Sequence, residues 1–327
     1  MPGLLHPIPR TATFSDPKYY VWGGSMVRTD DGTCHLYYSR WPRKTGMNGW
    51  VTHSEVAHGV SDHPLGPFRH VDVALPARGA EHWDGLCTHN PTVHRFGDTL
   101  FIHYTGNTGD GRATPDALNW THRNNQRVGV ATSTSPYGPW KRRDAPLIDI
   151  GPPGAPDSLC TTNPSITDRR DGRYLLIYKA VGTEHALPFG GPVVHLAATA
   201  DTPAGPFTKR EGLIFAKPGE AFPAEDPCLW RDDESYWAIV KDFKGYFTGA
   251  GRSLALFRSE DGFDWRPAED PLVATLEVDW DDGRTQRLHR LERPQVWLQG
   301  GAPAVLYCAA SEEPSESHSF NVHIPLR

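Results

Sequence analysis

Four pairs of polar residues stand directly before a proline, and two of these pairs are rich in acids. The pairs are His89-Asn90, Thr162-Asn163, Glu225-Asp226 and Glu292-Arg293. The last two contain three carboxylates and a guanidinium, and charges that converge in a pocket need partners or a chemical task. A protonated carboxyl beside an ionised one can supply general acid–base catalysis. Glu225, Asp226 and Glu292 are therefore candidate catalytic residues.

These pairs belong to an internal repeat that runs along the chain. Each pair leads into a short apolar strand, a turn, an aromatic-rich strand such as residues 174–178, and a third strand. A fifth copy starts at Trp22-Gly23, with Gly24 in place of the proline. The steps from Gly24 through Pro91, Pro164, Pro227 and Pro294 are 67, 73, 63 and 67 residues.

Four strands per copy and a period near 67 residues are typical of a β-propeller blade with long loops. Five copies predict an all-β, five-bladed propeller that occupies residues 1–327 as a single domain. The last copy has no room for a fourth strand, so we expect residues 8–14 to supply it and close the ring. A two-sheet sandwich also repeats hairpins, but it does not explain five copies of one motif.

Composition excludes several classes of protein. The chain has 32 Gly and 30 Pro spread along 327 residues, which indicates many turns, and its 11 Trp, 11 Tyr and 13 Phe exclude a disordered chain. No apolar run approaches the ~18–20 residues of a membrane span. A net charge of -6 without a basic block argues against a nucleic-acid partner. The five cysteines are far apart and lack a CxxC pattern, so neither a zinc ribbon nor a disulfide scaffold is expected.

The first residues show no charged segment followed by a long apolar one, so we expect a cytoplasmic protein. The sequence indicates no oligomeric state. We expect no cofactor, because the histidines show neither an HxH nor an HExxH pattern. A metal ion in the central channel stays an open alternative.

The repeat and its polar pairs resemble the five-bladed glycosidases of glycoside hydrolase families 43, 32, 62 and 117. In family 43, an Asp on blade one acts as the base, an Asp on blade three tunes the acid, and a Glu two residues before the blade-four Pro is the general acid. By this resemblance Glu225 is the general acid. The other two positions hold Gly23 and Asn163, so this sequence lacks the family's base and modulator.

Two acids elsewhere are candidates to replace the missing base. Asp84 and Asp157 each stand six residues before an Asn-Pro pair, within the related segments 84–91 and 157–164. They either activate water or bind loop amides, and the neighbouring Trp83 slightly favours Asp84. We also expect Asp226 and Glu292 to raise the pKa of Glu225, as a proton donor requires.

Candidate substrate-binding residues surround the same end of the predicted channel: Trp22, Trp41, His89, Asn90, Asn163, Asp157 and Arg293. Trp22 stands beside Gly23-Gly24, where missing side chains leave room for a sugar stacked on indole. Arg293 suits a substrate carboxylate or holds an acid ionised. Instead of binding substrate, Trp41 could pack at the edge of a blade, and Asn90 and Asn163 could stabilise turns.

Three functions fit these residues. The first is a glycoside hydrolase that cleaves a short oligosaccharide or glycoside with two carboxyl groups. The second is a uronate lyase that uses His89 and Arg293, and the third is a carbohydrate-binding propeller without catalysis. We favour the hydrolase, because a pure binder seldom needs three adjacent carboxylates facing a channel.

Overall fold

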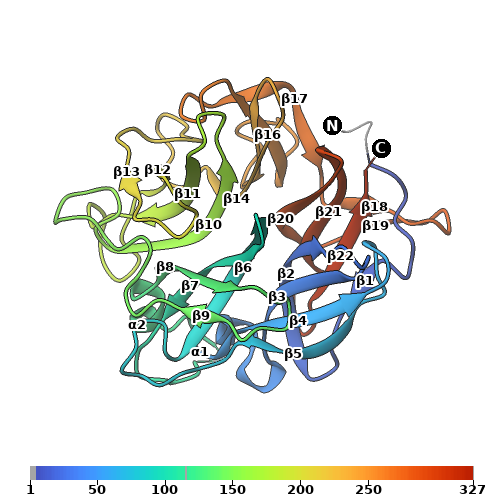
Figure 1. Cartoon of the computed structure of the whole chain (residues 1–327), viewed down its shortest axis with the longest axis horizontal. Coiled ribbons are helices and arrows are strands. Elements are labelled where there is room, and N and C mark those ends of the chain that lie inside the picture. The colour runs from blue at the N-terminus through green and yellow to red at the C-terminus, as the bar shows by residue number, and fades with distance from the viewer. Residues whose placement is uncertain (1–4, 115, 327) are drawn as a thin grey trace.

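The computed structural model describes residues 5–114 and 116–326. They form five four-stranded antiparallel sheets, arranged as blades around a central axis (Figure 1). The inner strands of neighbouring blades contact one another, and the later strands of each blade lie successively further out. The prediction of a five-bladed propeller is thereby confirmed.

The blades follow one another along the chain. Blade 1 contains β2 (Tyr19–Arg28), β3 (Cys34–Pro42), β4 (Glu55–Ser61) and β5 (Arg69–Leu75). Blade 2 contains β6 (Cys87–Phe96), β7 (Thr99–Asn107), β8 (Arg127–Ser133) and β9 (Lys141–Arg142). Blade 3 contains β10 (Cys160–Asp168), β11 (Tyr174–Val181), β12 (Val193–Ala200) and β13 (Thr208–Lys209). Blade 4 contains β14 (Ala224–Arg231), β15 (Tyr236–Asp242), β16 (Ser253–Ser259) and β17 (Arg266–Ala274). Blade 5 contains β20 (Arg290–Gln299), β21 (Ala302–Ser311), β22 (Phe320–Pro325) and β1 (Thr13–Phe14).

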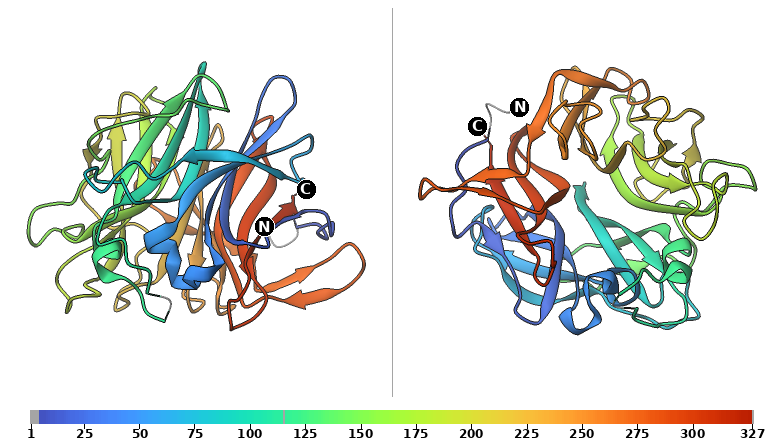
Figure 2. Two further views of the ribbon diagram at one scale, coloured as in Figure 1. Left: turned by 90° about the horizontal axis from the view of Figure 1, so that it is seen from below. Right: turned by 180° about the vertical axis from the view of Figure 1, so that it is seen from behind.

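The N-terminal strand closes the ring, as the length of the last repeat predicts. In blade 5, Thr13 and Phe14 of β1 pair with Val322 and Asn321 of β22. The two ends of the described chain therefore lie close together (Figure 2). This strand exchange links the first and last blades by backbone hydrogen bonds, so the propeller does not depend on side-chain packing alone to stay closed.

Few elements lie outside the blades. A β-ribbon of β18 (Glu277–Asp279) and β19 (Thr285–Arg287) joins blades 4 and 5. The short helices η2 (Arg43–Thr45), η3 (Met47–Gly49) and α1 (Trp50–His53) follow β3, and α2 (Trp120–Asn124) follows β7. Asn119 caps α2, because its side chain accepts a hydrogen bond from the backbone N–H of His122. Over residues 5–114 and 116–326, no helix is long and apolar enough to cross a membrane.

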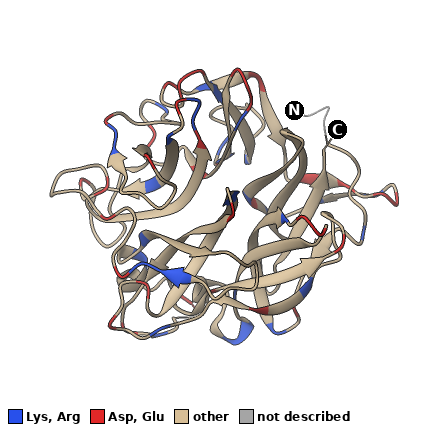
Figure 3. Cartoon of the chain, in the orientation of Figure 1, with Lys and Arg blue, Asp and Glu red and all other residues tan. Residues whose placement is uncertain are grey.

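Apolar side chains fill the spaces between neighbouring blades. Between blades 2 and 3, for example, Phe101 and Val130 pack in one cluster with Leu176 and Leu196. A blade is therefore covered on both faces, and every residue of β12 is buried. Charged residues of both signs are spread over the loops of the molecule (Figure 3).

Each inner strand contains a β-bulge at the repeated residue pair, which is polar in blades 2 to 5 and Trp22-Gly23 in blade 1. The register shifts there in all five blades, and the second residue of each pair has a left-handed backbone. These residues are Gly23 (φ 52°), Asn90 (51°), Asn163 (50°), Asp226 (56°) and Arg293 (56°). Gly, Asn and Asp tolerate this conformation better than other residues, which explains four of the five residue types. The bulge also lets both residues of a pair, such as Glu225 and Asp226, face the channel, although successive residues of a regular strand point to opposite faces.

Candidate active site

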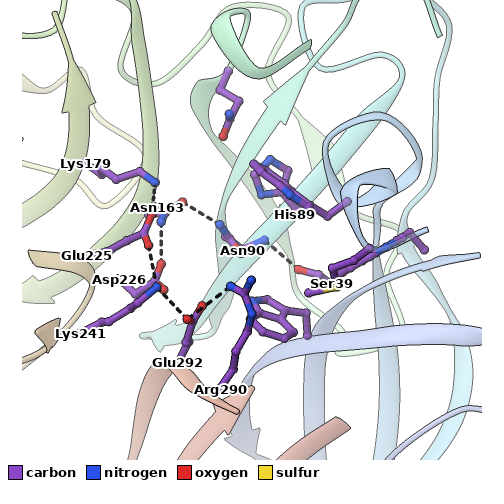
Figure 4. Close-up of a pocket in the computed structure, with 15 residues that line it drawn as sticks. Ser39, His89, Asn90, Asn163, Lys179, Glu225, Asp226, Lys241, Arg290 and Glu292 are labelled. Carbon is purple, nitrogen blue, oxygen red and sulfur yellow. Dashed lines mark hydrogen bonds and ion pairs between the residues drawn. The ribbon is translucent and has the colours of Figure 1, made fainter. Parts of the chain in front are cut away.

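A pocket of about 160 Å³ opens at one end of the propeller axis (Figure 4). The inner strands supply most of its polar walls, and the second strands, the blade-one loops and Gln126 of blade 2 supply the rest. The candidate residues that line it are Trp22, Trp41, His89, Asn90, Asn163, Glu225, Asp226 and Glu292. Asp84, Asp157 and Arg293 do not line it.

The five left-handed residues form a ring around the axis, which we call the collar (Gly23, Asn90, Asn163, Asp226 and Arg293). Nδ2 of Asn90 donates to Oδ1 of Asn163 at 2.7 Å, and Nδ2 of Asn163 donates to Oδ1 of Asp226 at 2.6 Å. Nη2 of Arg293 donates to the carbonyl oxygen of Asn90 at 2.6 Å, and its Nη1 lies 3.9 Å from Oδ1 of Asp226. Side chains from blades 2, 3, 4 and 5 are thus joined across the axis.

Arg293 and Gly23 complete the collar together. The Arg293 side chain lies across Gly23 so closely that a Cβ at position 23 would stand 2.4 Å from Cγ of Arg293. Arg293 is only 1% exposed, and a separate cavity beyond the collar is lined by residues further along the inner strands, such as Ser25 and Gln295. The collar therefore closes the channel below the pocket. This corrects the expectation that Arg293 binds substrate, because its guanidinium is buried in the floor.

Glu225 is held between two lysines. One carboxylate oxygen forms an ion pair with Lys179, and the other lies 3.2 Å from Nζ of Lys241. Burial by itself would raise the pKa of Glu225, but the charges of Lys179 and Lys241 outweigh it and hold that pKa well below its usual range. The expectation of a raised pKa at Glu225 was therefore wrong, because it left out both lysines.

The pKa of Asp226 is shifted in the direction opposite to that of Glu225. Its side chain is buried beside the ionised Glu225, and these two effects raise the pKa of Asp226 to about 6 despite Arg293 and the lysines. Its Oδ1 accepts the amide of Asn163, so Oδ2 is the oxygen that can carry a proton. The pocket thus holds a carboxyl poised to be protonated next to one that stays ionised.

Glu292 forms the third acidic group. Its Oε1 lies 2.8 Å from Nζ of Lys241 and 3.5 Å from Nη1 of Arg290, while within residues 5–114 and 116–326 no hydrogen bond is made to its Oε2. Arg290 is in turn held by an ion pair with Glu316. Lys241 thereby bridges Glu225 and Glu292, and one Glu292 oxygen stays available to a ligand or a water molecule (Figure 4).

Aromatic and neutral polar groups form the opposite wall. Trp22 and Trp50 line the pocket, and the Trp50 ring packs edge-on against His89 at 5.2 Å. His89 is 2% exposed, and neither of its ring nitrogens has a hydrogen-bond partner in the described part of the chain. Burial, with the charges of Arg293 and Lys179, lowers the pKa of His89 to about 3, so the ring is neutral at physiological pH. Trp41 touches the pocket but is a packing residue: it is 1% exposed and stacks on Tyr20.

Asp84 connects strands within blade 2, and Asp157 does the same within blade 3. Asp84 is fully buried, forms ion pairs with Arg78 and Arg142, and accepts a hydrogen bond from the Tyr104 hydroxyl at 2.6 Å. Asp157 repeats this arrangement one blade later, with Tyr178 and Lys209 as partners. This corrects the expectation that Asp84 replaces the base or that Asp157 binds substrate: the repeated acid links the second and fourth strands of its blade.

The sequence analysis missed Lys179 and Lys241, which control the charge of the site. Both follow the aromatic-rich run of a second strand, and antiparallel pairing sets Lys241 opposite Glu225 and Lys179 opposite Thr162. Counting back across each hairpin from the polar pair would have found them. No group of three or more His, Cys, Asp or Glu side chains among residues 5–114 and 116–326 is placed to hold a metal ion.

No protein-family model matches this sequence, and no curated protein is similar to it. Solved structures do match in fold. A family 117 glycoside hydrolase from the marine bacterium Zobellia galactanivorans aligns with a TM-score of 0.65 and 16% identity, over 95% of this chain and 86% of that one. A thermostable family-43 glycoside hydrolase aligns with a TM-score of 0.62 and 14% identity, over 96% and 92% of the two chains.

A third structure, that of BT0996 in a complex with RGII, aligns with a TM-score of 0.73 and 14% identity, over 99% of this protein and 92% of that one. The resemblance to five-bladed propeller glycoside hydrolases is thereby confirmed at the level of the fold.

Proposed function

We propose that the protein is a glycoside hydrolase that cleaves a short oligosaccharide or a small glycoside in the central pocket. One observation carries this proposal: of two adjacent carboxyls in the pocket, Glu225 is paired with two lysines, whereas Asp226 is buried beside that carboxylate. Glycoside hydrolysis needs one carboxyl that donates a proton and another that is ionised. The fold shared with glycoside hydrolases supports the same reaction class.

Asp226 is the proposed general acid. Its Oδ2 donates a proton to the glycosidic oxygen as the bond from that oxygen to the anomeric carbon breaks. Glu292 is the proposed base, because its free Oε2 can accept a proton from the water that attacks the anomeric carbon. Glu225 has both oxygens paired with lysines, so we assign it the role of an anion that helps to raise the pKa of the adjacent Asp226.

The walls of the pocket support a sugar as the ligand. Trp22 and Trp50 present indole rings, while His89 and Asn90 present hydrogen-bonding atoms. The collar closes the far end, so the proposed ligand enters only from the mouth. Such a dead-end pocket suits a small glycoside or the terminal residue of a chain rather than the middle of a polymer.

A panel of aryl glycosides with good and poor leaving groups tests these roles. We expect Asp226→Asn to lose roughly 10²–10⁴ in kcat/KM on substrates with poor leaving groups and much less on activated ones, because a good leaving group needs little protonation. Glu292→Gln should lose activity on both types. Glu220→Gln serves as a control, since this exposed acid contacts Tyr246 outside the pocket.

Two results would overturn the assignment. An equal loss of Asp226→Asn on both substrate types removes Asp226 from the acid role. A leaving-group dependence confined to Glu225→Gln would make Glu225 the donor despite its two lysines.

A carbohydrate-binding propeller is the second candidate, favoured by Gly23 and Asn163 at the positions where family 43 is expected to hold acids. It predicts measurable sugar affinity without turnover in the wild-type protein. The lyase reading loses its support, because the Arg293 guanidinium lies buried in the collar and does not line the pocket.

A further inference from the structure

Two half-buried phenylalanines, Phe222 and Phe243, stand at the pocket end of blade 4. Phe222 lies two residues before β14 begins, and Phe243 directly follows the last residue of β15. These strands pair Glu225 with Lys241, so both rings lie just beyond the charged groups of the site. The backbone N–H of Phe243 donates to the carbonyl oxygen of Pro223 at 3.4 Å, and the centroids of the two rings are 4.3 Å apart. The proposed hydrolysis assigns no role to either ring.

Each ring contacts one of the two lysines that pair with Glu225. Nζ of Lys241 lies over the Phe243 ring, 4.2 Å from its centroid, and Nζ of Lys179 lies 5.8 Å from the centroid of Phe222. The face of an aromatic ring attracts an ammonium, and the attraction grows when the cation is removed from water. The Lys241 side chain is 4% exposed, against 15% for Lys179, so the contact with Phe243 is both the shorter and the better shielded.

The two carboxylates do not occupy all sides of the Lys241 ammonium. An ammonium has three N–H donors, and the ion pairs with Glu225 at 3.2 Å and Glu292 at 2.8 Å account for two of them. The ring of Phe243 is a third favourable neighbour. It shields the ammonium from water without offering an oxygen that would draw it away from either carboxylate.

The loop that begins with Phe243 is held by the preceding residue, Asp242. This carboxylate is fully buried and accepts hydrogen bonds at 2.9 Å from the backbone N–H groups of Gly245, Tyr246 and Phe247. A carboxylate bonded to several backbone groups fixes the path of the loop around it. The Phe243 ring is therefore positioned by the protein itself, before any ligand binds.

We propose that Phe243 is a positioning residue, which holds the ammonium of Lys241 against Glu225 and Glu292. Phe222 supports it from the side of blade 3, because its ring packs on Phe243 and against an apolar cluster of that blade. The consequence for catalysis rests on the proposed function, in which these two carboxylates act. The contact between ring and ammonium does not depend on that function.

Hydrogen exchange of the Lys241 ammonium, followed by ¹⁵N NMR, tests the contact without turnover. The signal is assigned by its loss in Lys241→Met. We expect Phe243→Leu, which keeps an apolar side chain but removes the ring, to speed the exchange roughly 2- to 30-fold, the worth of one cation–π contact. Phe243→Tyr keeps the ring and should exchange like the wild-type protein.

A second variant separates attraction from packing and covers the case that Phe243→Leu does not fold. Replacing Phe243 by 3,4,5-trifluorophenylalanine nearly preserves the shape of the ring but withdraws electron density from its face, so the exchange should again be faster than in the wild-type protein. A ring that merely fills space would give the wild-type rate in this variant.

Activity provides the second readout. Phe243→Leu should move the acidic limb of the pH–rate profile to higher pH, in the same direction as Lys241→Met, and Phe243→Tyr should leave it in place. The other ionisable groups near Glu225 are unchanged in these variants: Lys179, Asp226, His195, Arg290 and Arg293.

Phe263→Leu is the matched control. This half-buried ring contacts Arg169 at 4.7 Å and Arg210 at 4.9 Å and does not line the central pocket. Its loss should change neither readout. The proposal is overturned if Phe243→Leu and the trifluorinated variant exchange at the wild-type rate, or if Phe263→Leu speeds the exchange as much as they do. Faster exchange in a protein without turnover would refute the proposed hydrolase and still support the positioning of Lys241.

Discussion

Gly23 is the residue at which the floor of the pocket is most sensitive to a single added carbon. In Gly23→Ala the new Cβ would stand 2.4 Å from Cγ and 3.2 Å from Cβ of Arg293. These atoms form the base of the arginine side chain, which cannot move without breaking the hydrogen bond from Arg293 to Asn90. The backbone at position 23 is also left-handed, at φ 52°.

The loss of folding stability that we expect in Gly23→Ala has two parts. Placing alanine in a left-handed conformation costs about 1–2 kcal/mol, and overpacking a filled site costs a further ~1–3 kcal/mol. Gly23→Ala should therefore lower the free energy of unfolding by roughly 2–5 kcal/mol. Gly97→Ala separates the two parts, because Gly97 is also left-handed (φ 61°) but a Cβ there would meet nothing within 4 Å. This control should cost only about 1–2 kcal/mol.

Urea unfolding followed by tryptophan fluorescence measures both variants. The double variant Gly23→Ala/Arg293→Ala completes the test: it removes the 2.4 Å contact with Cγ and keeps the 3.2 Å contact with Cβ, so the added cost at position 23 should fall towards that of Gly97→Ala. Equal losses for Gly23→Ala and Gly97→Ala, or an unchanged cost in the double variant, would refute the packing of Arg293 on Gly23. If the reasoning holds, it also explains why blade one cannot carry an acid here.

Three further predictions concern charge. Six buried histidines have pKa values of about 3 or 4 in the folded protein, against 6.5 when exposed: His35, His58, His89, His103, His195 and His323. Below pH 6.5 the unfolded chain therefore binds more protons than the folded one. At pH 5 this lowers the free energy of unfolding by about 2 kcal/mol per ring. Urea midpoints should fall steeply from pH 6.5 to 5, and a flat profile would contradict the burial of these rings. Asp84→Asn should destabilise the fold by about 3–5 kcal/mol, because it leaves Arg78 and Arg142 without their buried partner. Activity per folded molecule should be unchanged. A loss of kcat without a loss of stability would mean that Asp84 takes part in catalysis. Lys241→Met removes the cation that is paired with both Glu225 and Glu292, so it should move the acidic limb of the pH–rate profile to higher pH. An unmoved limb would mean that neither ion pair with this lysine matters for activity.

The repeated motif allowed the fold to be predicted because its signals are local. Polar pairs before proline recur at blade intervals, and the Asn, Asp and Gly residues in them suit the left-handed bulge of each inner strand. The short last repeat predicted that residues 8–14 would close the ring, and β1 pairs with β22 as expected.

The same motif brought most candidate residues of the site together. A residue's position within its repeat determines which end of the axis it faces, so Glu225, Asp226, Glu292 and His89 converge although they lie on three blades. The prediction failed for Asp84 and Asp157. Their regular spacing reflects a buried hydrogen bond from a second-strand tyrosine to the acid, which occurs in both blade 2 and blade 3.

Protonation was decided by the tertiary structure alone. The sequence places Glu225 next to Asp226, which suggests repulsion and a raised pKa at Glu225. The fold brings Lys179 from blade 3 and Lys241 from the neighbouring strand to Glu225. These lysines lower the pKa of Glu225, and the carboxyl whose pKa is raised is Asp226. A pKa depends on burial and on charges within a few ångströms, and strands far apart in the chain supply both here. The sequence thus determined which residues meet at the axis, and only their packing decided which of them can carry a proton.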